Sequence, residues 1–367
     1  MSNCIAVSAD GAPAMMGKNN GFLSFVLKQN PNILTIHCLL HRENLAAKHS
    51  QADMAIVFQE VVHVVNYIKK SALSTRMFAE LCEEAGAEFT CLLFYSKIRW
   101  LSKGKVLHRV VSLRNELFTF LSENKHPLAP RFADKIWIAK LVFFADFFTH
   151  LNVLNTSMQG RNKVFLEVLE DIEAFKAKVR LWILRMEKGR IAAFPQLNLF
   201  LEEEEDLEIN DLFSTFQEHL KGFLDQLNKY IPQHGYAKRF FWVRKPFDVS
   251  VSEMVEHEED EIFSEQLVDL QNRQLWKDSF KRLTLTEFWA QVSAQEPHLK
   301  YLCDLATEAL MPFATTYLCE AGFSLLAMIK NETRNRLQPE DDMRCALSSI
   351  EPQIDVLVEE LQGQGSH

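Results

Sequence analysis

The sequence predicts a mostly helical protein with a small α/β part. Three observations predict this fold class. Glycine and proline are sparse, with 12 and 11 copies in 367 residues, so few residues interrupt helices. Residues 4–40 alternate between two apolar runs and one helical segment, as a β-α-β unit does. From residue 42 to about residue 230, nearly every segment places apolar side chains at helical spacing.

The start of the chain predicts two strands around a helix. Residues 4–9 form a short apolar run that ends at Asp10, and residues 33–40 form a second run. Residues 20–29 between them have helical spacing and are followed by a proline. Strands joined in this way are normally parallel. Because two parallel strands are not a stable sheet alone, we expect either a helix to cover the free edge or further strands to complete the sheet.

The middle of the chain predicts a series of helices whose apolar stripes are core faces. The most apolar stretch, residues 141–148, contains Asp146, and we expect a buried helix there rather than a membrane span. Residues from about 279 to 361 are again predicted to be helical. The predicted helices of the middle part cover residues 52–70, 74–86, 103–123, 134–158, 163–187 and 207–229.

Composition restricts the class of function. The formal net charge is −9, so binding to nucleic acid would require a local basic patch, and an acidic protein without such a role fits the charge equally well. The seven cysteines form no CxxC pair, which is typical of reduced thiols in an intracellular protein. The amino terminus lacks the features of a signal peptide. The acidic runs at 202–206 and 253–261 are more typical of solvated segments than of recognition tails.

Residues 238–247 interleave basic and aromatic side chains. Such a pattern can stack on single-stranded DNA and hold its backbone. An extended segment buried against the core explains the same pattern, and we favour that interpretation.

Seven motifs follow one another in a fixed order. They are SADGAPAMMG (8–17), CLLHRENLAAK (38–48), YSKIRWLSKGKVLHRV (95–110), HLNVLNTSMQGRNK (150–163), PFATTYLCEAGFSLL (312–326), KNETRNRL (330–337) and DMRCALSSIEP (342–352). This ordered set resembles the hAT superfamily of DNA transposases over essentially the whole chain. It is most similar to the domesticated Buster/Charlie-like group, many members of which carry BED zinc fingers. No BED-type finger is found in this sequence.

The resemblance implies an RNase H-like fold, incomplete here, that is interrupted by a large all-helical insertion domain. Residues 1–48 would form a partial RNase H-like core with two parallel strands, and residues 49–280 the insertion domain. Residues 281–361 would complete the core and contribute to dimerisation, with 362–367 as a tail. The expected packing residues of this last region are Phe288, Trp289, Tyr317, Leu318 and Phe323.

The resemblance also implies an Asp-Asp-Glu triad that holds two Mg²⁺ ions for displacement at phosphorus. Asp10 matches the second Asp and Glu320 matches the Glu. Only nine residues precede Asp10, and none matches the first Asp. We therefore expect an incomplete triad, no bound cofactor and no catalysis unless an upstream segment restores the Mg²⁺ site. A simple turn at Asp10 and an ordinary helix-face carboxylate at Glu320 are the alternative interpretations.

Two further motifs predict contacts with DNA. Cys38 and His41 resemble a short Cys-x-x-His motif of the family, but no second Cys/His pair lies nearby at zinc spacing, so we expect no metal. His41 is predicted to be a polar group near the DNA-facing end of the sheet, and a structural histidine is the alternative.

The second motif is a basic cluster around an aromatic residue. In the family, an aromatic side chain at the position of Trp100 stacks on an unstacked base, an interaction worth about 1–3 kcal/mol. Arg99, Lys103 and Lys105 belong to the densest group of basic residues in the chain. A buried Trp100 beside a solvated helix face explains the residues equally well.

The sequence thus predicts a domesticated, catalytically inactive nuclear protein with residual DNA-binding or oligomerisation ability. Its expected partners are DNA and a second copy or another protein, with no membrane and no small-molecule substrate. Two alternatives stay open: an active transposase completed by upstream sequence, and a protein-interaction scaffold that does not bind DNA. Cytoplasmic location is the alternative to the nucleus.

Overall fold

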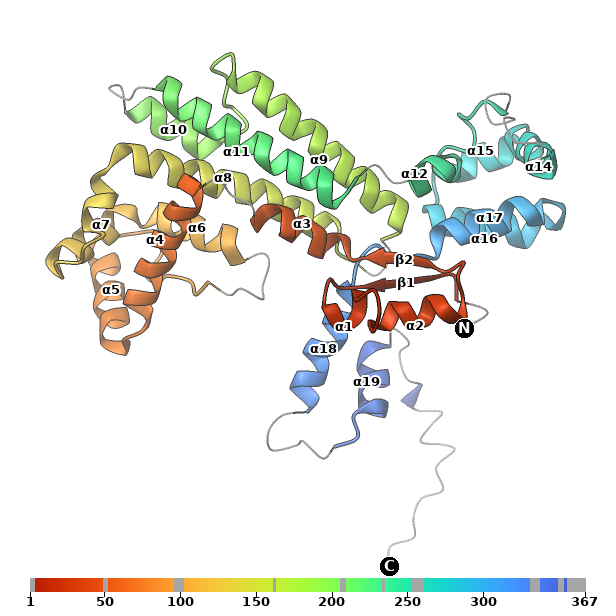
Figure 1. Cartoon of the computed structure of the whole chain (residues 1–367), viewed down its shortest axis with the longest axis horizontal. Helices are drawn as coiled ribbons and strands as arrows, with labels where there is room; N and C mark the ends of the chain where they lie inside the picture. The colour runs from red at the N-terminus through yellow and green to blue at the C-terminus, as the bar shows by residue number, and fades with distance from the viewer. Residues whose placement is uncertain are drawn as a thin grey trace, which may run out of the picture. The chain divides into compact units, whose positions relative to one another are not determined.

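The computed structural model shows a mostly helical chain with one small parallel sheet (Figure 1), as the sequence predicts. The RNase H-like fold itself stays a prediction. The chain divides into two compact units, Met1–Thr315 and Thr316–His367; the finer domain boundaries also stay predictions. The structure describes residues 4–48, 52–95, 102–160, 163–204, 209–232, 235–251, 261–330, 337–348 and 353–354.

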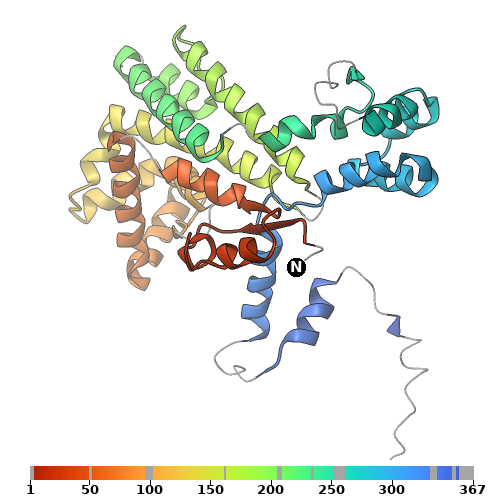
Figure 2. The same cartoon turned by 45° about the vertical axis from the view of Figure 1, so that its right-hand side comes forward.

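The sheet consists of two parallel strands in the described part of the chain. Strand β1 (Ala6–Ala9) pairs with β2 (Leu34–His37), from Ala6 opposite Leu34 to Ala9 opposite His37. The connection contains α1 (Pro13–Met16) and α2 (Phe22–Gln29), and α2 lies beside the sheet in both views (Figures 1 and 2). The predicted β-α-β unit and its parallel pairing are therefore confirmed.

A bundle of helices follows the sheet. Helix α8 is its central member, with α6, α10, α4, α9 and α11 packed around it. In both views α8, α9 and α11 run side by side (Figures 1 and 2). The elements are α3 (Leu39–Lys48), α4 (Ala52–Lys69), α5 (Ala72–Glu84), α6 (Ser102–Ser112), α7 (Arg114–Glu123), η1 (Ala129–Ala133), α8 (Lys135–Ser157), α9 (Phe165–Met186), α10 (Pro195–Glu203) and α11 (Ile209–Tyr230).

The apolar stretch 141–148 lies in α8 and is buried throughout, as predicted. Asp146 is buried with it and accepts hydrogen bonds from the Leu197 backbone N–H at 3.0 Å and from the Gln196 side chain at 3.1 Å. By length and composition α8 is apolar enough to cross a membrane, but 67% of its most apolar window is buried inside the protein. A core helix of a soluble domain has the same properties.

The segment 103–123 differs from the single helix expected. The backbone leaves helical geometry at Leu113, with φ −104° and ψ 20°, so that α6 ends and α7 begins there. The two halves have different partners, because α6 packs on α8 whereas α7 packs on α5 and η1. Buried Leu113 anchors the junction. Helix α10, which begins at Pro195, lies outside the helices expected from the sequence.

A second apolar core lies in the carboxyl-terminal part of the first unit. Trp242, Phe263 and Trp289 are buried together, and the Trp289 indole N–H donates to the Val243 carbonyl at 2.9 Å. Of residues 238–247, Phe240, Trp242 and Val243 are buried in this core as expected, whereas Phe241 is 47% exposed and the basic side chains are not buried. The segment forms helical turns rather than the extended structure expected. The elements are α12 (Gly235–Arg239), η2 (Phe241–Arg244), α14 (Glu261–Gln271), α15 (Gln274–Phe280), α16 (Leu285–Gln295), η4 (Pro297–Leu299) and α17 (Lys300–Leu310).

The second unit contains α18 (Tyr317–Ile329) and α19 (Glu340–Leu347), which pack on one another near Gly322. Of the expected packing residues, Phe288 and Trp289 are buried in the first unit, whereas Tyr317 in α18 is half-buried. Leu318 and Phe323 are 39% and 70% exposed, so within this chain they are not part of a core, and their role in packing stays a prediction. Among the described residues, α19 packs on α18 near Gly322, and this contact leaves Leu318 and Phe323 uncovered.

Candidate nucleic-acid interface

Four residues meet at the carboxyl ends of the two strands. Asp10 and Gly11 follow β1, His37 ends β2, and His41 lies in the first turn of α3. The His37 and His41 rings are 5.1 Å apart at 36°. Parallel strands present their carboxyl ends at one edge of the sheet, where α/β proteins place functional groups. The strand register explains the cluster. Ala9 opposite His37 is the last pair before both strands end, so the residues that follow them lie at the same edge.

Gly11 allows the two imidazoles to approach. A Cβ atom at this position would lie 2.7 Å from Nε2 of His41 and 2.8 Å from Nε2 of His37, closer than real Cβ contacts. Asp10 is exposed, and its Oδ1 accepts the Ala12 backbone N–H at 3.1 Å. The turn expected as the alternative interpretation of Asp10 is therefore present, and its match to a catalytic Asp stays a prediction.

Both imidazoles are uncharged near neutral pH. Burial, with the positive charge of Arg42 and the neighbouring His41, lowers the pKa of His37 to about 4 against the opposing pull of Asp10. Burial also lowers the pKa of His41, again against Asp10. Neutral imidazoles donate hydrogen bonds but attract phosphate weakly.

Arg42 supplies the permanent charge of this site. Its guanidinium is half-buried, and burial lowers its pKa, but arginine stays protonated in proteins. Within the described ranges no carboxylate forms an ion pair with it. Sequence reasoning missed Arg42 and His37. Pairing the two apolar runs would have placed His37 opposite Ala9, beside Asp10. Arg42 could have been found because it directly follows His41 in the sequence.

The basic cluster before and within α6 is only partly available to a ligand. The ammonium group of Lys103 lies over the rings of Phe58, Phe144 and Phe148, at 4.2, 4.8 and 4.2 Å from their centroids. This burial lowers the pKa of Lys103 to about 7. Lys103 therefore points into the bundle, contrary to the exposed DNA contact expected, because three aromatic faces surround its ammonium group.

Among the basic neighbours of Lys103, one is held by contacts within the protein and two are exposed. Arg109 stacks on Phe89 at 3.6 Å and donates to the Cys91 carbonyl at 2.7 Å. Lys105 and His108 are exposed. Arg99 and Trp100, the predicted base-stacking pair, lie outside the described residues.

Glu320 belongs to the second unit. It lies exposed in the first turn of α18 and accepts a hydrogen bond from the Thr316 hydroxyl at 3.2 Å. In the described part of the chain, no group of three or more His, Cys, Asp or Glu side chains is arranged to hold a metal ion. The match of Glu320 to a catalytic Glu stays a prediction.

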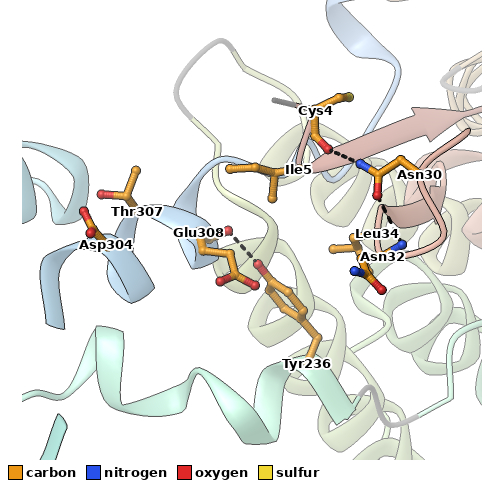
Figure 3. Close-up of a pocket in the computed structure, with 9 residues that line it drawn as sticks. All are labelled: Cys4, Ile5, Asn30, Asn32, Leu34, Tyr236, Asp304, Thr307 and Glu308. Carbon is orange, nitrogen blue, oxygen red and sulfur yellow. Dashed lines mark hydrogen bonds between the residues drawn. The ribbon is translucent and has the colours of Figure 1, made fainter. Parts of the chain in front are cut away.

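A cavity of about 500 Å³ lies at the opposite, amino-terminal end of the strands (Figure 3). The Tyr236 hydroxyl donates to the Glu308 carbonyl at 3.0 Å, and the Asn30 amide donates to the Cys4 carbonyl at 3.2 Å. The carboxylates of Asp304 and Glu308 repel phosphate, so this cavity does not extend the basic site. Its wall is formed by Cys4, Ile5, Asn30, Asn32, Leu34, Tyr236, Asp304, Thr307 and Glu308.

The comparison with known families concerns the segment from the last residue of β2 to the end of α9. Residues 37–187 match the family model of the FAM200/GTF2IRD2 helical domain. This family is related to domesticated hAT transposases. The matched segment contains His37, His41, Arg42, Lys103 and Lys105, and most of the bundle around α8. The transposase-derived character expected from the motifs is supported, and the narrower Buster/Charlie-like assignment stays a prediction.

Proposed function

We propose that this protein is a transposase-derived DNA-binding protein that does not cleave DNA. The observation that carries the proposal is the family match over residues 37–187. The candidate interface adds physical support, because Arg42 is a half-buried cation without a carboxylate partner among the described residues. A guanidinium in this state suits a phosphate oxygen, with which it forms charge-assisted hydrogen bonds.

In the proposed function, different side chains make chemically different contacts with DNA. Arg42 binds a backbone phosphate, and His41 donates a hydrogen bond beside it. Lys105 and His108 extend the basic surface from α6, where both are exposed. Trp100 stacks on an unpaired base, as the family resemblance implies, with Arg99 beside it. Phosphate contacts supply most of the affinity and make it sensitive to salt.

The absence of cleavage is a separate part of the proposal. A two-metal reaction at phosphorus needs several closely spaced carboxylates. Beside Asp10 the described part of the chain places the imidazoles of His37 and His41, which are not the oxygen ligands that Mg²⁺ prefers. An active enzyme is the alternative, in which upstream sequence supplies the first Asp. Strand transfer by a longer protein in Mg²⁺ would establish that alternative.

The proposal is tested by titrating the protein against a fluorescent DNA hairpin with a single-stranded flank, at about 50 mM and about 200 mM salt. We expect salt-sensitive binding that Arg42→Ala and Trp100→Ala weaken. Removing one phosphate contact reduces the slope of log affinity against log salt by about one, so Arg42→Ala should do so. Lys281→Ala is the matched control, because it removes an exposed positive charge far along the chain, in the part that contains the second apolar core. Absence of binding at both salt concentrations would refute DNA binding.

A protein-binding role is favoured by one observation in the second unit. On α18, Phe323 is 70% exposed and Met328 is 75% exposed. These two exposed side chains are the support for an interaction surface on α18. We include self-association through α18, and a nuclear location, in the proposed function. Sedimentation equilibrium tests self-association: Phe323→Ser with Met328→Ser should lower the apparent mass of any oligomer, and a monomeric parent protein would refute it.

A further inference from the structure

The cavity at the amino-terminal end of the strands differs from the candidate interface in the sign of its charge. Its volume of about 500 Å³ is within the range of pockets that hold small ligands. Its wall contains the carboxylates of Asp304 and Glu308, and none of its described lining residues is basic. The cavity therefore favours a positively charged ligand, which the proposed contacts with DNA do not involve.

Glu308 supplies the negative charge that lacks a partner. Asp304 forms an ion pair with Lys300 at 2.6 Å, and both of these side chains are exposed. Glu308 is half-buried, and its carboxylate forms no ion pair in the part of the chain that the structure describes. A half-buried carboxylate in this state has lost part of its hydration without gaining a charge partner. A cation that enters the cavity would supply that partner.

Tyr236 adds an aromatic ring to the same side of the cavity. Its hydroxyl donates to the backbone carbonyl of Glu308 at 3.0 Å, which ties the ring to α17 (Figure 3). The ring is also packed against Phe165 and Phe240, with centroids 5.4 and 4.6 Å away. The position of the ring is therefore fixed by the fold. An ammonium group is stabilised both by a carboxylate and by the face of an aromatic ring.

The opposite wall suits the hydrocarbon part of such a ligand. Ile5 and Leu34 present apolar side chains there, across the cavity from α17 in Figure 3. Asn30 holds this wall together, because its amide donates to the Cys4 carbonyl at 3.2 Å and its Oδ1 accepts the Asn32 backbone N–H at 3.2 Å. An apolar wall opposite a carboxylate matches a molecule with a charged end and a methylene chain.

We propose that this cavity binds a primary alkylammonium group, as carried by a lysine side chain or by a polyamine. The ammonium group contacts the Glu308 carboxylate and the Tyr236 ring, and its methylene chain lies against Ile5 and Leu34. A metal ion does not fit, because the described residues contain no group of three or more His, Cys, Asp or Glu side chains arranged to hold one. The site functions whether or not the protein binds DNA.

The proposal is tested by calorimetric titration of the whole protein, without DNA, with two probes. One is spermidine, and the other is a capped peptide of neutral residues with a single lysine. We expect one probe molecule per chain, and no binding when norleucine replaces the lysine. Glu308→Gln keeps the shape of the side chain and should weaken binding by about tenfold or more. Thr307→Trp should also weaken binding, because it fills the cavity without changing its charge.

A matched control separates this site from general attraction to a protein of net charge −9. Glu123→Gln removes an exposed carboxylate in α7 and should leave the affinity unchanged. Far-UV circular dichroism verifies that each variant is folded. Tighter binding of the lysine peptide would identify a protein as the source of the ammonium group, and tighter binding of spermidine a free polyamine. Failure of both probes to bind, or equal weakening by Glu308→Gln and Glu123→Gln, would overturn the proposal.

Discussion

The side-chain amide of Asn155 donates a hydrogen bond to the fully buried carboxyl group of Glu43, and so joins α8 to α3 across 112 residues. Gln159, just beyond the end of α8, donates to the side-chain carbonyl oxygen of Asn155 at 3.4 Å. Burial raises the pKa of Glu43 to about 8, although the bond from Asn155 opposes this shift. Glu43 is therefore protonated at neutral pH. Because α3 also carries His41 and Arg42, this bond fixes the helix on which the candidate interface depends.

Glu43→Gln should remove a pH dependence of stability. The folded protein keeps the Glu43 proton up to about pH 8, whereas the carboxyl of the unfolded chain releases it near 4.5. Between these values the folded state binds more protons, so the contribution of Glu43 to stability falls as pH rises. We expect the free energy of unfolding of the parent to decline relative to that of Glu43→Gln from pH 5 to pH 8, as measured by urea denaturation.

Two further variants make this prediction specific. Asn155→Ala leaves the buried carboxyl without its donor and should cost about 1–3 kcal/mol. Glu123→Gln, at an exposed position in α7, should leave the pH profile unchanged. A parent and Glu43→Gln with parallel pH profiles would show that Glu43 is ionised in the folded protein.

The sequence could predict the helices because their apolar stripes are long and regular. The stripe of residues 134–158, for example, corresponds closely to α8, and β1 and β2 were indicated by their apolar runs. The break at Leu113 could not be predicted, because the periodicity continues through it and the cause is a change of packing partner. Phe323 shows a second reason why prediction fails. Its residue type favours burial, but nothing in the sequence says which face of α18 is covered.

The site was less predictable than the fold. Asp10 and His41 were singled out, and the sheet brings them together because both follow strand ends. Lys103 carries the same charge as Lys105, but only the tertiary structure shows that its ammonium group lies between phenylalanine rings. Arg42 was not considered, since the lack of a partner for its charge is a property of the fold.

Lys103→Met should stabilise the protein below neutral pH. The folded state releases the Lys103 proton above about pH 7, whereas lysine in the unfolded chain keeps it to about 10.5. Between these values the unfolded state binds more protons, so the stability of the parent rises with pH. At pH 6 the variant should be more stable by about 1–2 kcal/mol, after loss of the cation–π contacts is subtracted.

The difference in free energy of unfolding between the parent and Lys103→Met should become smaller from pH 7 to pH 10. Thermal or urea denaturation at several pH values measures it. Lys105→Met is the matched control, because Lys105 is exposed on the same helix and its substitution should change stability by less than about 0.5 kcal/mol. A Lys103→Met variant that is less stable than the parent at pH 6 would show that the aromatic cage favours the charged amine.

Six of the seven cysteines should react with a thiol reagent in two groups, and the half-buried Cys4 is left out of the comparison. Cys91, Cys319 and Cys345 are exposed, whereas Cys38, Cys82 and Cys303 are buried. Burial also raises the pKa values of Cys82 and Cys303 to about 11, which reduces the reactive thiolate further. Mass spectrometry after brief alkylation of the native protein should find label at the first group and not at the second. Rapid labelling of Cys82 or Cys303 without denaturant would contradict the described packing.

Gly104 and Gly222 should respond in opposite ways to alanine. At Gly104 in α6, a Cβ would lie 2.3 Å from the Asn152 amide nitrogen and 3.1 Å from the Phe148 carbonyl oxygen. Because α6 packs closely on α8 at this point, Gly104→Ala forces Asn152 or the helix itself to move, at a cost of about 1–3 kcal/mol. Outside its own helix backbone and its neighbours in sequence, Gly222 in α11 has no described atom within 4 Å of its Cβ position, so Gly222→Ala should stabilise by about 0.5–1 kcal/mol through helix propensity.

The double variant Gly104→Ala with Asn152→Ala identifies the cause of the first effect. Shortening Asn152 removes the nearest clash and should recover part of the lost stability, whereas the contact with the Phe148 backbone remains. Urea denaturation of the single and double variants gives the coupling energy between the two positions. Additive effects would mean that α6 moves away from α8 as a whole. Such a movement would draw Lys103 out of its aromatic cage and return its pKa toward the ordinary value.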